Sequence, residues 1–417
     1  MRDYAKAANQ SLKTLFGDGY LQRFSVRLWD GTQLGARERG AFTLLINDPG
    51  ALRAALRPPI DLNVGRAFAA GLIDIEGDAE VAVDTLMRRV SQGAGLHLLR
   101  LGLLLRQLPK AALPRLREAH LHGKRHSIER DRAAIGFHYD QPVEFYRTFL
   151  DSNLVYSCAY FDEGVQTLDD AQIAKIDYSL KKLRLRPGER LLDIGCGWGG
   201  LAVRAAKQFG AHVVGVTLSE RQVEEAQRRI AAEGLKGQAA VEYRDYRELP
   251  NASFDKIVSI GMFEHVGRTN LPAYFSTAHR LLKRGGLFLN HGISHEGPGD
   301  GKAVGFMDKF IFPDGELVRV SDALARAEDA GFEVRDVENL REHYHRTIRA
   351  WIANLERNRE RAVAAAGEQS YRAWRLYLAG SAQGFHAGRM GLFQSLLAKP
   401  LADGVSGVPA TRRDLYR

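Results

Sequence analysis

The stretch LLDIGCGWGG, residues 191–200, constrains the fold more than any other part of this 417-residue sequence. An apolar run ends in Asp193, and glycines follow at 195, 197, 199 and 200 before an amphipathic run begins. Glycines at such a junction let the backbone turn sharply and approach a ligand closely. Strand-like and helix-like runs continue to alternate, with strands expected at 189–195, 212–218, 239–246, 254–263 and 285–293. This alternation predicts a doubly wound parallel sheet of the α/β class.

Two later runs complete the expected sheet. Residues 332–340 and 388–399 are typical of strands, and amphipathic helices are expected between them at about 344–364 and 368–383. The sequence therefore predicts seven strands, mostly parallel.

The glycine pattern also indicates which ligand binds. A dinucleotide fingerprint needs G-x-G-x-x-G and an acidic residue about 20 positions later. Here the second strand ends in Thr217, and Asp193 stands two residues before the first glycine. Asp-x-Gly-x-Gly in this position is instead typical of the S-adenosylmethionine loop of class I methyltransferases. The cofactor is expected at the carboxyl ends of the strands.

The first 95 residues differ in pattern. Short strands are expected within 20–48 and short helices at 49–57, 64–71 and 79–90, which predicts a small α+β domain, residues 1–95, for binding lipid or substrate. Residues 96–137 are expected to form a basic amphipathic linker. The linker holds nine Lys or Arg and three acidic residues, so it accounts for about two-thirds of the net charge of +9. Its leucines and cations suit an anionic membrane surface, although solvated helices would explain them too.

Two observations bear on location. Two cysteines cannot build a disulfide framework, which favours a reducing cytosol. The N-terminus lacks the apolar core of a signal peptide, and the longest apolar stretch, 95–108, is too short to span a bilayer. The chain is therefore expected to be cytoplasmic and peripherally attached to the inner face of the cell membrane. A homodimer is plausible, because two basic segments would bind a membrane better than one.

Four segments resemble one known family. They are FHYDQPVEFYRTFLDSNLVYSCAYF (137–161), the glycine loop with its following helix and strand (191–222), IVSIGMFEHVG (257–267) and FLNHGI (288–293). The chain resembles the cyclopropane-fatty-acyl-phospholipid synthases, relatives of the mycolic acid cyclopropane synthases, strongly over 138–398 and more weakly in the N-terminal domain. The resemblance implies a class I methyltransferase domain at 138–417.

The resemblance also implies which residues bind S-adenosylmethionine. Tyr156 and Ser157 should contact its methionine end, Thr217 and Gln222 the ribose, and Tyr246 and Arg247 the adenine. Ser219 with Gln222 also fits a helix capping box, so Gln222 has a purely structural alternative. The full set of expected cofactor-binding residues is Tyr156, Ser157, Asp193, Gly195, Cys196, Gly197, Gly199, Thr217, Leu218, Gln222, Asp245, Tyr246 and Arg247.

The implied reaction adds a methyl group to a cis double bond and leaves a carbocation. Loss of a proton from the added methyl then closes a cyclopropane ring, so the site needs aromatic faces, little water and a base. Tyr160, Phe161, Phe263 and Tyr344 are candidates for the aromatic faces. The resemblance implies bicarbonate as the base, held by Cys158, Glu264, His291, the backbone of Ile293 and Tyr344. Glu264 and His291 could alternatively be ordinary residues at strand ends.

Three other roles are disfavoured. Family members commonly have a cysteine in a late helix, and Ser381 stands at that place, which excludes thiol catalysis from it. Cys158 has no adjacent activating base in the sequence, so it is interpreted as a wall of the anion pocket. No CxxC motif and no cysteine–histidine pair has the spacing of metal ligands, so no metal is expected.

The sequence thus predicts an S-adenosylmethionine-dependent C-methyltransferase that forms cyclopropane fatty acids in membrane phospholipids. The same first step could instead give a methyl-branched or exomethylene chain, or a cation trapped by water. A nucleic-acid methyltransferase would also explain the basic charge, but the cations lie in a leucine-rich segment, so no nucleic-acid partner is expected. A lipid-binding protein with an inactive cofactor site is disfavoured by the intact glycine loop.

Overall fold

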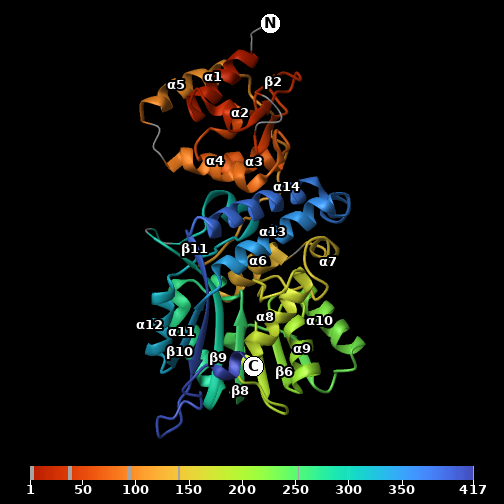
Figure 1. Ribbon diagram of the computed structural model, residues 1–417, viewed down its shortest axis with the longest axis vertical. Helices are drawn as coiled ribbons and strands as arrows, with labels where there is room; N and C mark the ends of the chain where they lie inside the picture. The colour runs from red at the N-terminus through yellow and green to blue at the C-terminus, as the bar shows by residue number, and fades with distance from the viewer. Residues whose placement is uncertain are drawn as a thin grey trace. The chain divides into compact units, whose positions relative to one another are not determined.

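The computed structural model describes residues 4–35, 40–91, 95–139, 141–251, 253–297, 299 and 301–416. The chain forms two compact units, which Figure 1 shows coloured along the sequence. Unit 1 comprises residues 1–120, 304–311 and 355–383, and unit 2 comprises residues 121–303, 312–354 and 384–417.

Unit 1 has the expected α+β character. Its sheet has the order β2-β1-β3-β4, in which β1 and β3 are parallel and the other pairs antiparallel. The strands are β1 (Ser25–Arg27), β2 (Gln33–Leu34), β3 (Phe42–Ile46) and β4 (Ile73–Gly77). The helices before residue 92 are α1 (Tyr4–Phe16), η1 (Tyr20–Gln22), α2 (Ala51–Ala55), α3 (Ile60–Ala69) and α4 (Ala79–Ser91).

Helix α5 (Gly95–Gln107) lies in the stretch that the sequence assigned to a linker. Leu101 and Leu105 are buried in the core of unit 1, because leucines three and four positions apart form one apolar stripe. Leu99 and Leu103 are instead 76% and 62% exposed. The expected linker is therefore divided, with residues 96–120 in unit 1 and residues 121–137 in unit 2.

Unit 2 contains the predicted seven-stranded sheet, in the order β10-β11-β9-β8-β5-β6-β7. All neighbours from β9 to β7 are parallel, and only β11 runs antiparallel to the strands on either side of it. The strands are β5 (Arg190–Ile194), β6 (His212–Thr217), β7 (Ala239–Tyr243), β8 (Phe254–Ile260), β9 (Leu282–His295), β10 (Glu333–Asn339) and β11 (Met390–Ala398). Each predicted strand is confirmed, with ends shifted by a few residues.

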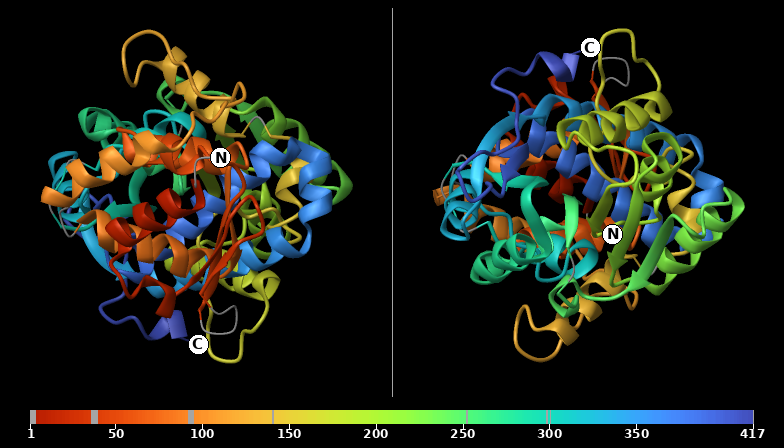
Figure 2. Two further views of the ribbon diagram at one scale, coloured as in Figure 1. Left: turned by 90° about the horizontal axis from the view of Figure 1, so that it is seen from above. Right: turned by 90° about the horizontal axis from the view of Figure 1, so that it is seen from below.

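Helices cover both faces of this sheet (Figures 1 and 2). One face packs against α8 (Leu168–Lys182), α9 (Gly200–Phe209) and α10 (Glu220–Ala232). The other packs against α11 (Leu271–Leu281) and α12 (Val320–Asp329). Because side chains alternate along a strand, Leu287 and Leu289 of β9 face the first group and Phe288 faces the second. This alternation decides on which side each polar residue of β9 lies.

The remaining elements are mostly short. They are α6 (Ile128–Tyr139), α7 (Val143–Tyr146), η2 (Tyr246–Glu248), η3 (Phe263–His265), η4 (Arg268–Asn270), the π-helical turn η5 (Met307–Ile311) and η6 (Arg413–Tyr416). Two long helices, α13 (Arg341–Arg357) and α14 (Arg359–His386), precede β11. Gly367 interrupts α14 with φ +82°, at the break that the sequence predicted between 364 and 368.

Candidate active site

The loop between β5 and α9 is shaped by glycines in the left-handed region. Gly195 has φ +80°, and a Cβ there would lie 2.7 Å from Cβ of Met262. Gly199, the N-cap of α9, has φ +79°, and a Cβ there would lie 2.9 Å from Cβ of Ala226. Any other residue would be strained at both positions. The loop can therefore lie close to Met262, which follows β8, and to α10 only because the sequence supplies glycine.

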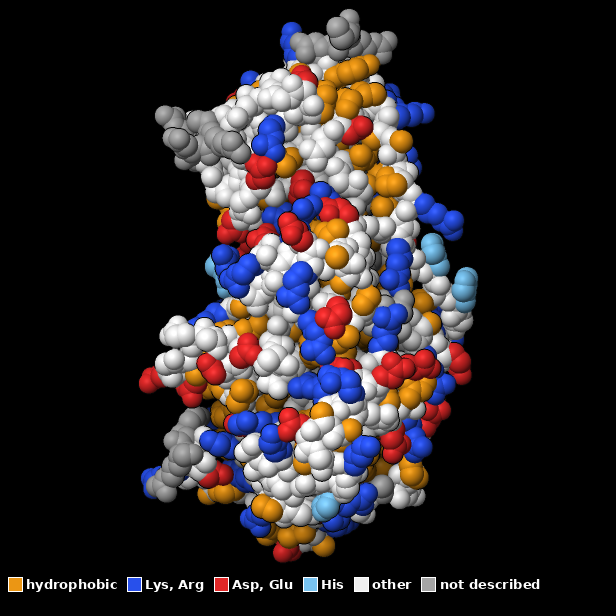
Figure 3. Space-filling view, turned by 90° about the vertical axis from the view of Figure 1, so that its right-hand side faces the viewer, with side chains coloured by type: hydrophobic (Ala, Val, Ile, Leu, Met, Phe, Trp, Pro, Cys, Tyr) orange, Lys and Arg blue, Asp and Glu red, His pale blue; other side chains and the backbone are white. Residues whose placement is uncertain are grey.

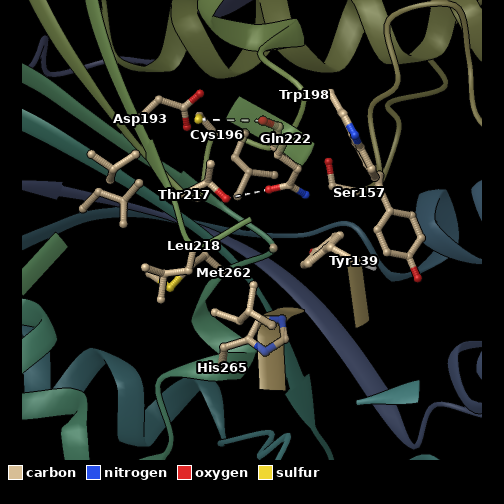
Figure 4. Close-up of a pocket in the computed structure, with 18 of the residues that line it drawn as sticks. Tyr139, Ser157, Asp193, Cys196, Trp198, Thr217, Leu218, Gln222, Met262 and His265 are labelled. Carbon is tan, nitrogen blue, oxygen red and sulfur yellow. Dashed lines mark hydrogen bonds between the residues drawn. The ribbon is translucent and has the colours of Figure 1, made fainter. Parts of the chain in front are cut away.

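A cavity lies beside this loop, at the carboxyl ends of β5, β6 and β8. Figure 4 shows Ser157 and Trp198 on one side of it and Leu218 and Met262 on the other. Gly199 does not line the cavity, because it supports the loop from behind against α10. The other expected cofactor residues all line it: Tyr156, Ser157, Asp193, Gly195, Cys196, Gly197, Thr217, Leu218, Gln222, Asp245, Tyr246 and Arg247.

Asp193 is the acid of the glycine motif. Its side chain is buried, and its Oδ2 atom has no hydrogen-bond partner among the described residues. Burial raises the pKa of Asp193 to about 7, while the nearby Lys175 acts in the opposite direction. A buried carboxylate without a partner is costly, so this atom is available to a ligand with donor groups.

The side chain of Gln222 does not take the capping role that the sequence left open for it. The Ser219 side chain caps α10 by accepting a hydrogen bond from the Gln222 backbone N–H at 3.4 Å. The Gln222 side chain does not complete the capping box. Its Oε1 instead accepts a hydrogen bond from Thr217 Oγ1 at 2.6 Å, drawn as a dashed line in Figure 4. The amide is thereby held at the wall of the cavity.

Arg247, which was expected to contact adenine, also lines the cavity. Arg247 forms ion pairs with Asp245 at 2.6 Å and with Asp131 at 2.9 Å. These two carboxylates orient the guanidinium, and Asp131 on α6 lines the cavity as well. Tyr246, beside them, is buried. Helix α6 thus contributes a wall that the sequence analysis did not assign.

Lys175 on α8 is the most informative residue that sequence reasoning missed. It lines the cavity, is 1% exposed, and donates a hydrogen bond from Nζ to Ser157 Oγ at 2.8 Å. Burial lowers the pKa of Lys175 to about 8, against the effect of the nearby Cys158, Asp151 and Asp193. A buried ammonium group lowers the free energy of unfolding unless it is paired, so its presence here indicates a functional or structural role.

Lys175 belongs to a polar row on α8. Gln172, Lys175, Ser179 and Lys182 are all buried, at spacings of three and four residues that place them on one helix face. Gln172 Nε2 donates to the carbonyl of Ser157 at 2.7 Å, and Lys182 pairs with Glu338. A polar face of this spacing would be solvated in most helices, whereas here it faces the sheet. The spacing of these four polar residues was visible in the sequence. Without the fold, such spacing indicates an ordinary solvent-exposed helix face.

Glu264 and His291 are the expected holders of an anionic base. Glu264 Oε1 accepts a hydrogen bond from the Ile293 backbone N–H at 2.6 Å. Its Oε2 atom and His291 Nε2 are both buried and have no hydrogen-bond partner among the described residues. Burial raises the pKa of Glu264 to about 7 and lowers that of His291 well below its usual range. Glu264, His291 and Ile293 do not line the described cavity. Residues 260–262 and 265, which are close to Glu264 in the chain, do line it.

Cys158 and Tyr344 were expected at the same anion. Cys158 is completely buried, and its Sγ atom lies 3.2 Å from the Ala159 carbonyl oxygen and 3.8 Å from that of Leu340. Burial strongly raises the pKa of the Cys158 thiol, so it is not a thiolate nucleophile at neutral pH. Tyr344 is buried next to Phe385, with ring centroids 4.7 Å apart.

The other aromatic candidates for cation stabilisation have separate surroundings. Tyr160 stacks on His343 with centroids 4.6 Å apart, Phe161 lies under the guanidinium of Arg346 at 4.2 Å, and Phe263 packs in the core near Tyr274. The aromatic residues that line the cavity are instead Tyr139, Tyr156, Trp198 and Tyr246.

Comparison with known proteins identifies a family that matches this chain. A sequence model of the mycolic acid cyclopropane synthetases matches residues 126–395. A probable fatty acid methyltransferase of Pseudomonas putida is 40% identical over 398 residues, covering 94% of this chain and 96% of that protein. Cyclopropane mycolic acid synthase 1 of Mycobacterium tuberculosis is 38% identical over 271 residues, covering 61% of this chain and 93% of that protein.

Two solved structures resemble the chain. The cyclopropane synthase MmaA2 from Mycobacterium tuberculosis has a TM-score of 0.61 and 34% identity, over 64% of this chain and 98% of that one. Mycolic acid cyclopropane synthase CmaA1, solved with S-adenosylhomocysteine, has a TM-score of 0.61 and 37% identity, over 64% of this chain and 97% of that one. Both similarities cover about two-thirds of the chain, whereas the Pseudomonas relative covers nearly all of it.

Proposed function

The chain belongs to the mycolic acid cyclopropane synthetase family of S-adenosylmethionine-dependent methyltransferases, and on that premise we propose that it forms cyclopropane rings on membrane phospholipids. The substrate would be the cis double bond of an unsaturated acyl chain. The names of the relatives, fatty acid methyltransferase and cyclopropane mycolic acid synthase, support a long acyl chain as the acceptor. The nearly full-length match to the Pseudomonas protein supports a fatty acid in particular.

One observation carries this proposal. Beside a cavity lined by the cofactor residues, Glu264 and His291 each bury a polar atom that no described residue satisfies. Alkene methylation needs such a site, because a carbocation must be shielded from water while a base accepts one proton.

The proposed roles of the residues follow from their contacts. When bound, S-adenosylmethionine supplies an electrophilic methyl group, and Asp193 and Gln222 would orient it from the cavity wall. The alkene π pair would form the new carbon–carbon bond while the methyl–sulfur pair stays on the sulfur, so that S-adenosylhomocysteine is the leaving group and a carbocation remains on the acyl chain. The C–H pair of the added methyl then closes the ring as its proton leaves for the base. Buried aromatic and aliphatic walls exclude water during this interval.

Bicarbonate is the proposed base, and the residues fit it in part. Glu264 Oε2 can accept its hydroxyl hydrogen and His291 Nε2–H can donate to its oxygens. The Ile293 N–H already donates to Glu264, so a bound anion would share or replace that bond. The thiol of Cys158 lies near two backbone carbonyls, which makes its part in holding an anion the weakest of the set.

The proposed membrane contact involves the outer face of α5. Leu99 and Leu103 are exposed there beside Arg100 and Arg106, so apolar and basic side chains alternate on one helix surface. Such a face suits an anionic bilayer, and a homodimer would present two of them. Among the described residues, no helix is both long and apolar enough to cross a membrane. On the face in Figure 3, Lys and Arg are mixed with Asp and Glu, unlike a continuous basic nucleic-acid track.

Lipid analysis tests the reaction. The chain is expressed in a host with unsaturated phospholipids, and the fatty acids are analysed by mass spectrometry. Modified chains are expected to gain one CH₂ each, and Asp193→Ala should abolish the gain. Methylated DNA or RNA with unchanged lipids would refute the proposal.

A methyl-branched or exomethylene product is the second candidate, favoured by the name of the Pseudomonas relative. Nuclear magnetic resonance of the purified fatty acid separates the outcomes, because only a cyclopropane gives ring CH₂ protons at unusually high field. Vinylidene protons would identify an exomethylene chain instead.

Charge reversal tests the membrane contact. The double variant Arg100→Glu/Arg106→Glu should sediment less with anionic vesicles, because each cation near the surface contributes roughly 1 kcal/mol. Lys181→Glu/Lys236→Glu is the matched control, since both lysines are exposed in unit 2 and the net charge changes equally. Equal binding of the two double variants would refute a role for α5.

A further inference from the structure

Gln394 and His291 form a cross-strand pair within the sheet of unit 2. The antiparallel register of β11 and β9 places them directly opposite each other. Both side chains lie on the face covered by α8, the same face as Leu289 and Leu396. Gln394 is completely buried, and its Nε2 atom lies 3.1 Å from His291 Nδ1.

Ser179 on α8 determines how the Gln394 amide is oriented. The Ser179 hydroxyl donates its single proton to the Lys175 carbonyl at 2.8 Å. It can therefore only accept from Gln394, whose Nε2 lies 3.3 Å away. The amide nitrogen, with its two hydrogens, thus faces both Ser179 and His291.

The reversed amide would satisfy fewer groups. Its oxygen would face the Ser179 oxygen, and both N–H groups would point to the place where Gln394 Oε1 has no partner among the described residues. Buried donors without partners are rarer in proteins than buried carbonyls without partners. The observed orientation is therefore the favoured one, and His291 Nδ1 accepts a hydrogen bond.

We propose that Gln394 is a positioning residue that keeps His291 neutral, with its only ring proton on Nε2. The imidazole then acts as a hydrogen-bond donor toward the anion pocket and not as the base of the reaction. This inference rests on the proposed function for the identity of the anion. The position of the proton can be tested without it, because it follows from Gln394 and Ser179 alone.

The groups around His291 act in the same direction. Burial, followed by the nearby ammonium groups of Lys175 and Lys182, lowers the pKa of His291 well below its usual range. Protonation would also bring an Nδ1–H against the N–H groups of Gln394. Glu264, the nearby carboxylate of the proposed pocket, is itself hydrogen-bonded to Ile293. His291 is therefore disfavoured as a cation from α8 and from β11.

Nitrogen NMR of the full chain, labelled with ¹⁵N-histidine, tests the proton position directly. The signal of His291 is assigned by its absence in His291→Gln. Between pH 5.5 and 8.5, Nδ1 should give an unprotonated signal and Nε2 a protonated one. In Gln394→Glu, the carboxylate can only accept, so Nδ1 should become protonated. A protonated Nδ1 in the unsubstituted protein would overturn the proposal.

Two further variants complete the NMR experiment. Gln394→Met removes the donor and should give a mixture of both neutral tautomers; an unchanged Nδ1 signal in this variant would also overturn the proposal. Asn290→Asp is the matched control, because it places the same charge on the neighbouring residue of β9, whose side chain accepts from Tyr274 on the α11 side. It should leave the His291 signals unchanged.

Turnover separates this inference from the proposed function. Partners that orient a functional histidine typically change activity by about 10- to 100-fold. Gln394→Glu should lower kcat about tenfold at pH 8.5, with an unchanged KM for S-adenosylmethionine. The loss in this variant should be smaller at pH 6, because the added carboxylate favours a second ring proton on His291 there and Nε2 then keeps its hydrogen. If the NMR result holds and no lipid is modified, the proposed function fails and the inference stands. An unchanged kcat in Gln394→Glu, with its ring proton moved, would refute the positioning role.

Discussion

The cofactor cavity and the Glu264–His291 region are adjacent but are built in different ways. The cavity is formed mainly by consecutive loop residues, such as 193–198 and 244–247, whose backbone turns create the space. The second region is assembled from single side chains on η3, β9, β11 and α8, which lie up to 215 residues apart, from Ser179 to Gln394. The cavity can be predicted from a sequence motif, because many of its residues are consecutive in the chain. The second region depends on the register of the sheet and on one helix face, so substitutions there should affect turnover more than cofactor binding.

The largest effect is expected at the cavity. Asp193→Ala removes the buried carboxylate that has a free oxygen, and hydrogen bonds to charged groups contribute about 1.5–3 kcal/mol. Affinity for S-adenosylhomocysteine should fall about 10- to 100-fold by calorimetry, and turnover should be lost. Asp177→Asn, on the same side of the sheet and paired with Arg204, is the control. Unchanged affinity in Asp193→Ala would place the cofactor elsewhere.

Glu264→Gln should separate the two regions most clearly. We expect kcat to fall about 100-fold while the Kd of S-adenosylhomocysteine changes less than about twofold, because positioned acid–base groups contribute on this scale. Glu316→Gln is the control, because it replaces another buried carboxylate. Glu316 lies next to Glu264, since its backbone N–H donates to the Glu264 carbonyl. Its kcat should stay within about threefold of the parent. Parallel losses of kcat and affinity in Glu264→Gln would show that the residue supports the fold.

The same residue should produce a pH-dependent stability difference. The pKa of Glu264 is raised by burial to about 7 in the folded chain, from 4.5. Between pH 4.5 and about 7, the folded chain therefore holds a proton on Glu264 that unfolding releases. The stability that this bound proton provides is lost as the pH rises through 7. Between pH 5 and 8, the free energy of unfolding should fall by up to about 3 kcal/mol more than in Glu264→Gln. Denaturant titrations without cofactor measure this, and parallel curves would contradict it.

A smaller effect is expected where the two regions meet. Lys175→Met removes the ammonium that donates to Ser157 and favours the ionised form of Asp193. Cofactor affinity should fall about tenfold at pH 7 and recover partly at pH 8.5, where Asp193 ionises without help. Lys182→Met is the matched control, as it removes a buried lysine of the same helix that pairs with Glu338. Equal effects would show that any buried charge on α8 matters equally.

The smallest effect is expected at Cys158. Cys158→Ser keeps a small polar group at a buried position whose thiol has a raised pKa. Turnover should fall less than about tenfold, because a neutral thiol contributes at most a weak hydrogen bond. Mass spectrometry after treatment of the folded protein with iodoacetamide should find Cys158 unmodified. Complete loss of activity in a folded variant would restore the nucleophile hypothesis.

The sequence predicted the features that arise from neighbouring residues better than those that arise from contacts between distant elements. The seven strands were predictable because buried parallel strands and amphipathic helices leave strong local patterns. The glycine motif predicted the loop at 193–199, and the family resemblance implied the other expected residues that line the cavity. Gly199 was assigned to the ligand, whereas it packs against Ala226. Lys175 and Gln394 were not found, because a lysine on a helix and a glutamine in a strand acquire meaning only from the elements packed against them.

Strand β11 also has a consequence for biosynthesis. It is the last of the seven strands to leave the ribosome, yet it lies between β9 and β10. A nascent chain that ends before residue 390 contains strands β5 to β8, whose carboxyl ends line the cavity, but β9 has an open edge and His291 lacks its partner. Ribosome-stalled chains should therefore acquire cofactor binding before catalytic competence. Until β11 inserts, the edge of β9 and the whole of β10 lack their partner strand, so both are open to pairing with other chains.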